Sequence, residues 1–136
     1  MTLPRVDFRS PRWLWGPVVL QLAVIFAASS IPNLKQIPGG ISDKSGHSIG
    51  YAILAALLLR ALAGGRLQGV TWKRVLAAIG LSTLYGVSDE FHQLFVPGRS
   101  ADPYDVLADA IGSIIGTTIG WLLSAARRWG ILGSSS

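Results

Sequence analysis

The sequence predicts an all-α integral membrane protein, with four transmembrane helices in an antiparallel bundle and both termini in the cytoplasm. Half of the 136 residues are hydrophobic and only 14% are charged, whereas soluble domains carry about 25% charged residues. The hydrophobic residues form four runs of roughly 17–24 residues, and a helix needs about 20 to cross the hydrocarbon core. No run alternates like a barrel strand, so helices are expected to satisfy the backbone in lipid.

Residues that end or begin helices separate the four runs. The predicted helices cover residues 13–30, 47–63, 74–95 and 103–125. The first three end at strong helix breakers, namely Pro32, the Gly64 and Gly65 pair, and Pro97 with Gly98. The fourth begins with Asp102 as N-cap and Pro103 in the first turn, an arrangement typical of helix starts.

The basic residues predict the orientation of the chain. Nine of the twelve lie at the ends of the runs expected on one side of the membrane, and three (Lys35, Lys44 and Arg99) lie on the other. The positive-inside rule places the nine in the cytoplasm, where four tryptophans would also meet the interface. The expected parts are a cytoplasmic segment 1–12, a transmembrane domain 13–125 and a cytoplasmic tail 126–136. Cations that flank apolar runs do not form a phosphate-binding stripe, so no nucleic-acid partner is expected.

Six of the seven acidic residues lie between positions 43 and 109, at the ends of the apolar runs. Ionisable groups at membrane depth are costly, so such a cluster is a hypothesis about function. Helical spacing places polar residues on one face of each of three predicted helices. These sets are Asp43, His47 and Tyr51; Tyr85, Asp89 and Gln93; and Asp102, Asp105, Asp109 and Gly112. The simplest arrangement is one shared pocket near the outer surface.

Helix capping is the alternative explanation for part of this cluster. Carboxylates in the first turn favour the helix dipole, so Asp43, Asp102 and Asp105 are also candidates for plain caps. Capping does not explain Asp89, Glu90 or Asp109, which lie late in one helix and inside another. For His47 and His92, helix-to-helix hydrogen bonding and a site role both remain open, and Tyr51 and Tyr85 are also expected to pack with satisfied hydroxyls.

The same residues are the candidates for chemistry. Asp89, Glu90 and His47 are candidate catalytic groups for acid–base work, but their spacing identifies no reaction. Asp102-x-x-Asp105-x-x-x-Asp109 invites comparison with lipid phosphotransferases that hold a metal on helices. The paired arginine and glycine element of those enzymes is missing, and neither HExxH nor Gly-x-Ser-x-Gly is present. No metal and no cofactor are therefore expected.

The fourth predicted helix carries a ridge of small residues. Gly112, Gly116 and Gly120 are spaced by four, and Ala108 extends the ridge by one turn. Such spacing permits close contact between helices. We expect this contact to draw Asp109 toward the third helix and its Asp89.

Three blocks of residues resemble the VanZ-like family of small bacterial membrane proteins. They are residues 43–47 (DKSGH) with Tyr51, residues 89–99 (DEFHQLFVPGR), and residues 105–112 (DVLADAIG) with Gly116. The stretch 29–32 also resembles the end of the family's first helix, so the resemblance covers roughly residues 20–120. Two positions depart from the family: Asp109 stands where asparagine is common, and Ser48 where an aromatic residue often follows the histidine.

The resemblance implies a multi-pass protein of the bacterial cytoplasmic membrane, related to a protein linked to teicoplanin resistance, and it implies no reaction. We expect an envelope amphiphile, either a lipid-linked precursor or a glycopeptide, to bind in the outward-facing pocket. Its anionic head would meet Arg99, Lys44 and His47, with Asp89, Glu90, Gln93 and Asp109 holding those cations. The ligand-binding candidates are Lys44, His47, Tyr51, Asp89, Glu90, Gln93, Arg99, Asp105 and Asp109. The alternatives are an acid–base enzyme acting on a lipid-linked substrate and a structural or assembly subunit.

Overall fold

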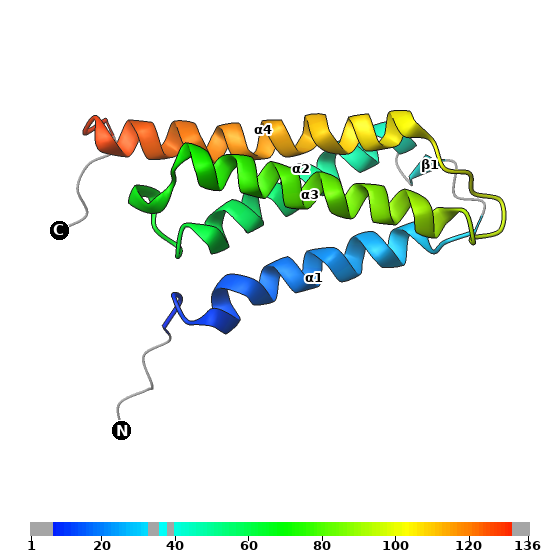
Figure 1. Ribbon diagram of the computed structural model, residues 1–136, viewed down its shortest axis with the longest axis horizontal. Coiled ribbons are helices and arrows are strands. Elements are labelled where there is room, and N and C mark those ends of the chain that lie inside the picture. Colours follow the sequence, from blue (N-terminus) through cyan, green and yellow to red (C-terminus); the bar gives the residue numbers. More distant parts are fainter. Residues whose placement is uncertain (1–6, 33–35, 38–39, 132–136) are drawn as a thin grey trace, which may run out of the picture.

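The computed structural model describes residues 7–32, 36–37 and 40–131. Its helices are α1 Pro11–Ser29, α2 Asp43–Leu62, α3 Trp72–Gln93 and α4 Pro103–Arg128, with a short 3₁₀ turn η1 at Leu67–Gly69. Two short antiparallel strands, β1 Gln36–Ile37 and β2 Ile41–Ser42, lie between α1 and α2. Successive helices alternate in direction (Figure 1), so the predicted four-helix antiparallel bundle is confirmed.

Three of the four helices are long and apolar enough to cross a membrane, namely α1, α2 and α4. The third helix, α3, is as long but carries a polar second half that includes Ser88, Asp89, Glu90, His92 and Gln93. Its crossing of the membrane stays a prediction, and so does the orientation of both termini. Two of the cations used for that orientation, Arg5 and Lys35, lie outside the described residues.

Three of the helices, α2, α3 and α4, begin where a side chain caps the first turn. Asp102 accepts a hydrogen bond from the backbone N–H of Tyr104 and α4 starts at the next residue, as predicted. In contrast, α2 begins four residues before its expected start. Ser42 caps it by accepting from the N–H of Ser45, so the polar first turn is helical and Asp43 is not the N-cap. Hydrophobicity alone could not place this start, because the turn contains almost no apolar residue.

The ridge of small residues on α4 packs closely, but against a different helix from the one expected. Gly112 lies against the backbone of Ser48 and Gly116 against that of Ala52, so an added methyl group would overlap α2 at both places. The Ser48 hydroxyl donates to the carbonyl of Ala108 at 2.8 Å, which strengthens the same contact. The glycines of the ridge therefore contact α2 and not the third helix, although Asp109 itself does lie against α3, at Gly86. Glycine spacing identifies the contact face of a helix but not its partner.

The interior is apolar near α1 and polar between α3 and α4. Leu14 and Val18 of α1 pack with Leu54 and other buried residues of α2. Between α3 and α4 the hydroxyl of Ser113 donates to that of Ser82 at 2.8 Å, and both residues are fully buried. Small hydroxyls allow these two helices to approach closely.

The two ends of the bundle differ in composition. All five tryptophans are exposed and occupy the half where α1 and α3 begin and α4 ends (Figure 1): Trp13, Trp15, Trp72, Trp121 and Trp129. The connections from α1 to α2 and from α3 to α4 lie at the opposite end. The acidic residues of positions 43–109 gather at that second end.

Candidate functional site

A buried, hydrogen-bonded pair of side chains between α2 and α4 forms the centre of the polar end. His47 Nδ1 lies 2.9 Å from Asp109 Oδ1, and Asp109 is completely buried. His47 stacks in parallel on Tyr51 one turn further along α2, with the ring centroids 6.2 Å apart. Asp109 therefore fixes the ring through one nitrogen, and Nε2 has no hydrogen-bond partner within the described part of the chain. A carboxylate that holds one imidazole nitrogen sets which nitrogen is available for chemistry.

The two carboxylates of α3 are held by neutral groups. Asp89 Oδ2 accepts from the hydroxyl of Ser29 at 2.7 Å, and the Gln93 amide donates to Glu90 Oε1 at 3.2 Å. Glu90 Oε2 also accepts from the backbone N–H of Asp102 at 2.8 Å, which ties α3 to the start of α4. Within the described residues neither Asp89 nor Glu90 contacts a basic side chain.

Lys44 and Arg99 contact different carboxylates from the ones that we expected. Lys44 Nζ lies 2.7 Å from Asp102 Oδ2 and 2.8 Å from Asp105 Oδ1. Arg99 Nη1 lies 3.5 Å from Asp43 Oδ1. Within the described part of the chain, Asp109 is the only one of Asp89, Glu90, Gln93 and Asp109 that contacts Lys44, His47 or Arg99. The expected pairing is therefore wrong for the other three. Each pairing depends on how the helices are rotated, which helical spacing does not determine.

The contact with Lys44 changes the acidity of the residue that caps α4. The hydrogen bond from Lys44 lowers the pKa of Asp102 below its usual range, and the N–H of Tyr104 lowers that pKa further. Because its side chain accepts the N–H of Tyr104, Asp102 is the N-cap of α4. Capping was one of the two roles, cap or site residue, that the sequence left open for it. Its carboxylate also fixes the position of Lys44 at the entrance to α2.

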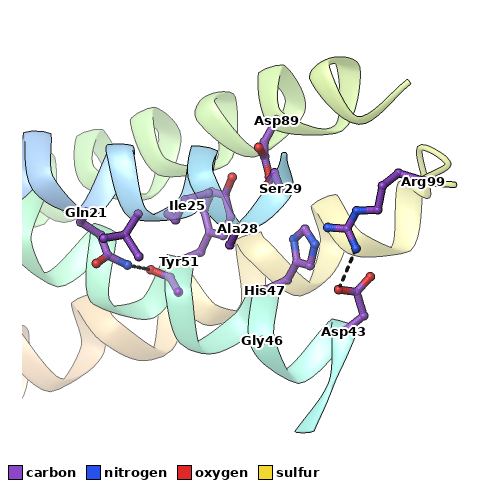
Figure 2. A pocket seen from close by; sticks show the side chains of 12 residues that line it. Gln21, Ile25, Ala28, Ser29, Asp43, Gly46, His47, Tyr51, Asp89 and Arg99 are labelled. Carbon is purple, nitrogen blue, oxygen red and sulfur yellow. Dashed lines mark hydrogen bonds and ion pairs between the residues drawn. The ribbon is translucent and has the colours of Figure 1, made fainter. Parts of the chain in front are cut away.

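A cavity of about 170 Å³ opens beside this network, between α1 and α2 (Figure 2). One part of its wall is ionisable, with Asp43, His47, Asp89 and Arg99, and Tyr51 lies beside them. The other part is formed by α1 and is largely apolar: Val24, Ile25 and Ala28. Figure 2 shows Asp89 reaching from α3 toward Ser29 at the end of α1. Polar and apolar walls thus meet in one small space.

A second hollow of about 400 Å³ lies next to the first and shares Asp43 and Arg99 with it. Lys44, Gln93 and Asp105 line this second hollow. The candidates from the sequence are therefore all gathered at one end of the bundle, and most of them line one or both of the two hollows. Glu90 and Asp109 line neither hollow and instead support the residues that do.

Sequence reasoning missed the contribution of α1. Gln21 and Ser29 both line the cavity, and Gln21 donates to the carbonyl of Gly50 at 3.0 Å. No charged residue on α1 pointed to this role, although Ser29 lies in the stretch that resembled the family. Asp43 was considered only as a cap and as a member of the face that carries His47, yet it lines both hollows.

The remaining histidine and tyrosine have separate outcomes. His92 Nε2 lies 3.0 Å from the hydroxyl of Ser30 and its ring stacks on Phe26, so it joins α3 to α1 away from the cavity. The hydroxyl of Tyr85 donates to the carbonyl of Leu22 at 2.9 Å, as a packed tyrosine should. Tyr51 differs, because its buried hydroxyl has no partner within the described residues.

One group of side chains has the composition of a metal site. Asp43, His47 and Asp105 each place one possible ligand atom within 4.8 Å of the others. However, Asp105 contacts Lys44 and Asp43 contacts Arg99. A divalent cation would have to displace both basic side chains, so this group is better described as part of the ion-pair network.

The fold and this end of the bundle define a helical membrane protein with a polar cluster at one end. The sequence profile of the VanZ/LLP1 family matches residues 21–124, which cover most of the chain, and the protein belongs to that family. A search of curated proteins and a search of solved structures gave no significant match.

Proposed function

We propose that this protein is a multi-pass protein of the bacterial cytoplasmic membrane, with both termini inside, that binds an envelope amphiphile in its outward-facing polar end. The amphiphile is a lipid-linked precursor or a glycopeptide such as teicoplanin. The observation that carries this proposal is the mixed wall of the cavity between α1 and α2. A single space that offers ionisable and apolar surface suits a molecule with a polar head and an apolar body.

The surroundings of the cavity support the same assignment. Val24 of α1 lines the cavity and is exposed, and Ile49 and Ile53 are exposed on α2, which forms another part of its wall. Such side chains suit contact with lipid tails, so an amphiphile in the cavity would continue into the bilayer. The outer face of α3 is similarly apolar, with Leu84, Val87 and Phe91 exposed, which supports its crossing of the membrane.

The size of the cavity limits what enters it. Pockets that enclose a whole drug-sized ligand have volumes of about 300–1,000 Å³, whereas this cavity has about 170 Å³. A head group of a few heavy atoms fits, and the rest of the ligand must lie along α1 and α2. A glycopeptide would therefore be held by one of its groups and not enclosed.

Two matched variants of α1 test the binding. Ala28 lines the cavity. The residue before it, Ala27, is exposed but does not line the cavity. The full chain is purified from bacterial membranes in nanodiscs, and retained amphiphiles are measured by native mass spectrometry. Ala28→Phe should reduce the retained amphiphile at least tenfold, and Ala27→Phe should leave it unchanged. Equal retention in the two variants would overturn the proposal.

The same pair tests a link to antibiotics. If the bound amphiphile is a glycopeptide or a precursor that a glycopeptide recognises, expression of the protein changes susceptibility to teicoplanin. Ala28→Phe should abolish that change while Ala27→Phe keeps it. A change that survives Ala28→Phe would separate susceptibility from the cavity.

A second candidate function is favoured by the His47–Asp109 pair. A histidine oriented by a buried carboxylate can act as a general acid or base toward a bound group, and His47 lines the cavity. Under this hypothesis Asp89→Asn abolishes conversion of a lipid-linked substrate while the protein still folds and inserts. For a structural or assembly subunit, the third alternative, Asp89→Asn instead lowers the melting temperature and abundance together with any function. A melting curve in detergent separates the two.

A further inference from the structure

We propose that the head group taken by this cavity is cationic, an ammonium or a similar charged hydrogen-bond donor, and that Asp89 and Tyr51 bind it. This inference rests on the proposed function and names the charge of the ligand. It reverses the expectation from the sequence, in which an anionic head meets the three cations.

Carboxylates outnumber basic side chains at the polar end. Six carboxylates lie in this part of the sequence, against Lys35, Lys44, Arg99 and two histidines. Lys44, Arg99 and His47 each contact a carboxylate. An anionic head would compete with these carboxylates for the same basic groups and would also lie beside Asp89. A cationic head needs no such exchange.

Asp89 is the carboxylate without a cation that lines the cavity. It is only 3% exposed, and it meets Ser29 and Gln93, both neutral, through Oδ2. Its Oδ1 is buried and has no hydrogen-bond partner within the described residues. A buried carboxylate without compensation costs several kcal/mol, so a charged donor that reaches Oδ1 has a large advantage over a neutral one.

Tyr51 supplies a second acceptor in the same wall. It is 1% exposed, lines the cavity and leaves its hydroxyl oxygen without a partner among the described residues. Two buried oxygens that both lack partners are unusual in a folded protein. An ammonium group carries up to three N–H donors, which match the needs of both oxygens. A carboxylate or phosphate head can accept from the Tyr51 hydroxyl, but it offers no donor to Asp89 Oδ1.

Three small probes with the same six-carbon chain separate charge from hydrophobicity. Hexylammonium, hexan-1-ol and hexanoate are titrated into the full chain in nanodiscs, and apparent affinities are taken from the shift in melting temperature. We expect hexylammonium to bind at least tenfold more tightly than either of the others, because a hydrogen bond between a charged donor and a carboxylate is stronger than one from a neutral hydroxyl. Equal affinity for hexan-1-ol, or tighter binding of hexanoate, would overturn the proposal.

Variants locate the effect. Asp89→Asn and Tyr51→Phe keep the shape of each side chain, and each should reduce the preference for hexylammonium over hexan-1-ol, Asp89→Asn by at least tenfold. Asp102→Asn removes a carboxylate from the same end that does not line this cavity, and should change the preference less than twofold. If Asp89→Asn fails to fold, Tyr51→Phe alone decides, since an undiminished preference in it contradicts the proposal.

These experiments separate failure of the charge assignment from failure of the proposed binding function. If Ala28→Phe removes retained envelope amphiphile but hexylammonium is not preferred, only the charge assignment is overturned. If Ala28→Phe and Ala27→Phe retain amphiphile equally, the binding function itself fails.

Discussion

Gly86 of α3 lies directly against the carboxylate of Asp109 on α4, so that an added methyl group at position 86 would overlap Asp109 Oδ2. Asp109 is completely buried and its other oxygen contacts His47. The absence of a side chain at Gly86 therefore makes room for the carboxylate that fixes the histidine. This relationship joins three helices at one point.

The first prediction follows from that contact. Gly86→Ala should lower the free energy of unfolding by about 1–3 kcal/mol, the usual cost of overpacking a core. Gly80 is the matched control, because it lies on the same helix and an added methyl group meets nothing within 4 Å. Gly80→Ala should leave stability unchanged or raise it by up to about 1 kcal/mol. Unfolding in mixed micelles with increasing SDS measures both, and similar effects of the two changes would contradict the contact.

The second prediction concerns the coupling of His47 with Asp109. A double-mutant cycle with His47→Ala and Asp109→Ala should give a coupling of about 1–3 kcal/mol in the free energy of unfolding, because both partners are buried. The half-exposed pair of Ser30 and His92, which lie 3.0 Å apart, serves as the comparison and should couple by less than about 0.5 kcal/mol. Equal coupling in the two pairs would show that the first pair is not special.

The third prediction is a pH dependence at the entrance to α2. The hydrogen bond from Lys44 lowers the pKa of Asp102 from its ordinary value of 3.8. A lowered pKa in the folded state means that the ionised carboxylate stabilises the fold above about pH 3.8 and loses this effect as the pH falls below it. Lys44→Met should therefore lower the melting temperature at neutral pH, and the difference from the wild type should shrink below pH 3.8.

Lys73 provides the control for this effect. It lies over the Trp72 ring, with Nζ 5.8 Å from the ring centroid, and forms no ion pair among the described residues. Lys73→Met should change the melting temperature by the same amount at neutral pH and at about pH 3. A Lys44→Met difference that persists undiminished at pH 3 would refute the role of the Asp102 contact.

The fourth prediction concerns orientation. The chain contains no cysteine, so single cysteines can be placed and labelled with a membrane-impermeant maleimide on whole cells. Ser100 and Gln68 are both exposed and lie in connections at opposite ends of the bundle. We expect labelling of Ser100→Cys and none of Gln68→Cys until the cells are opened. The reverse pattern would place the cavity on the cytoplasmic side.

The helices were predictable from the sequence because apolar runs, caps and breakers are local. The N-cap Asp102 and the breakers after the first two runs placed three of the boundaries within one residue. The start of α2 was not predictable in this way, since its first turn is polar and only the cap at Ser42 makes it helical. The hairpin of β1 and β2 was also missed, because two-residue strands have no periodicity to detect.

The site was predictable as a set of residues but not as a set of contacts. Helical spacing placed His47, Asp89 and Asp109 on inward faces, and all three lie at the polar end. Their partners depend on helix rotation and tilt, so the pairing of Lys44 with Asp105 and the contact of Ser29 with Asp89 could not be derived. The part played by α1 was hidden because it contributes a hydroxyl and apolar side chains and no charge.

The placement of the tryptophans determines which half of the molecule their fluorescence reports on. All five are exposed in the half opposite the cavity, so emission excited selectively from tryptophan reports on that half. We expect events at Asp89 or His47 to leave this emission almost unchanged. A sixth tryptophan at an exposed, non-lining position such as Ala27 would give the silent half its own signal, and a difference spectrum against the parent chain would isolate it.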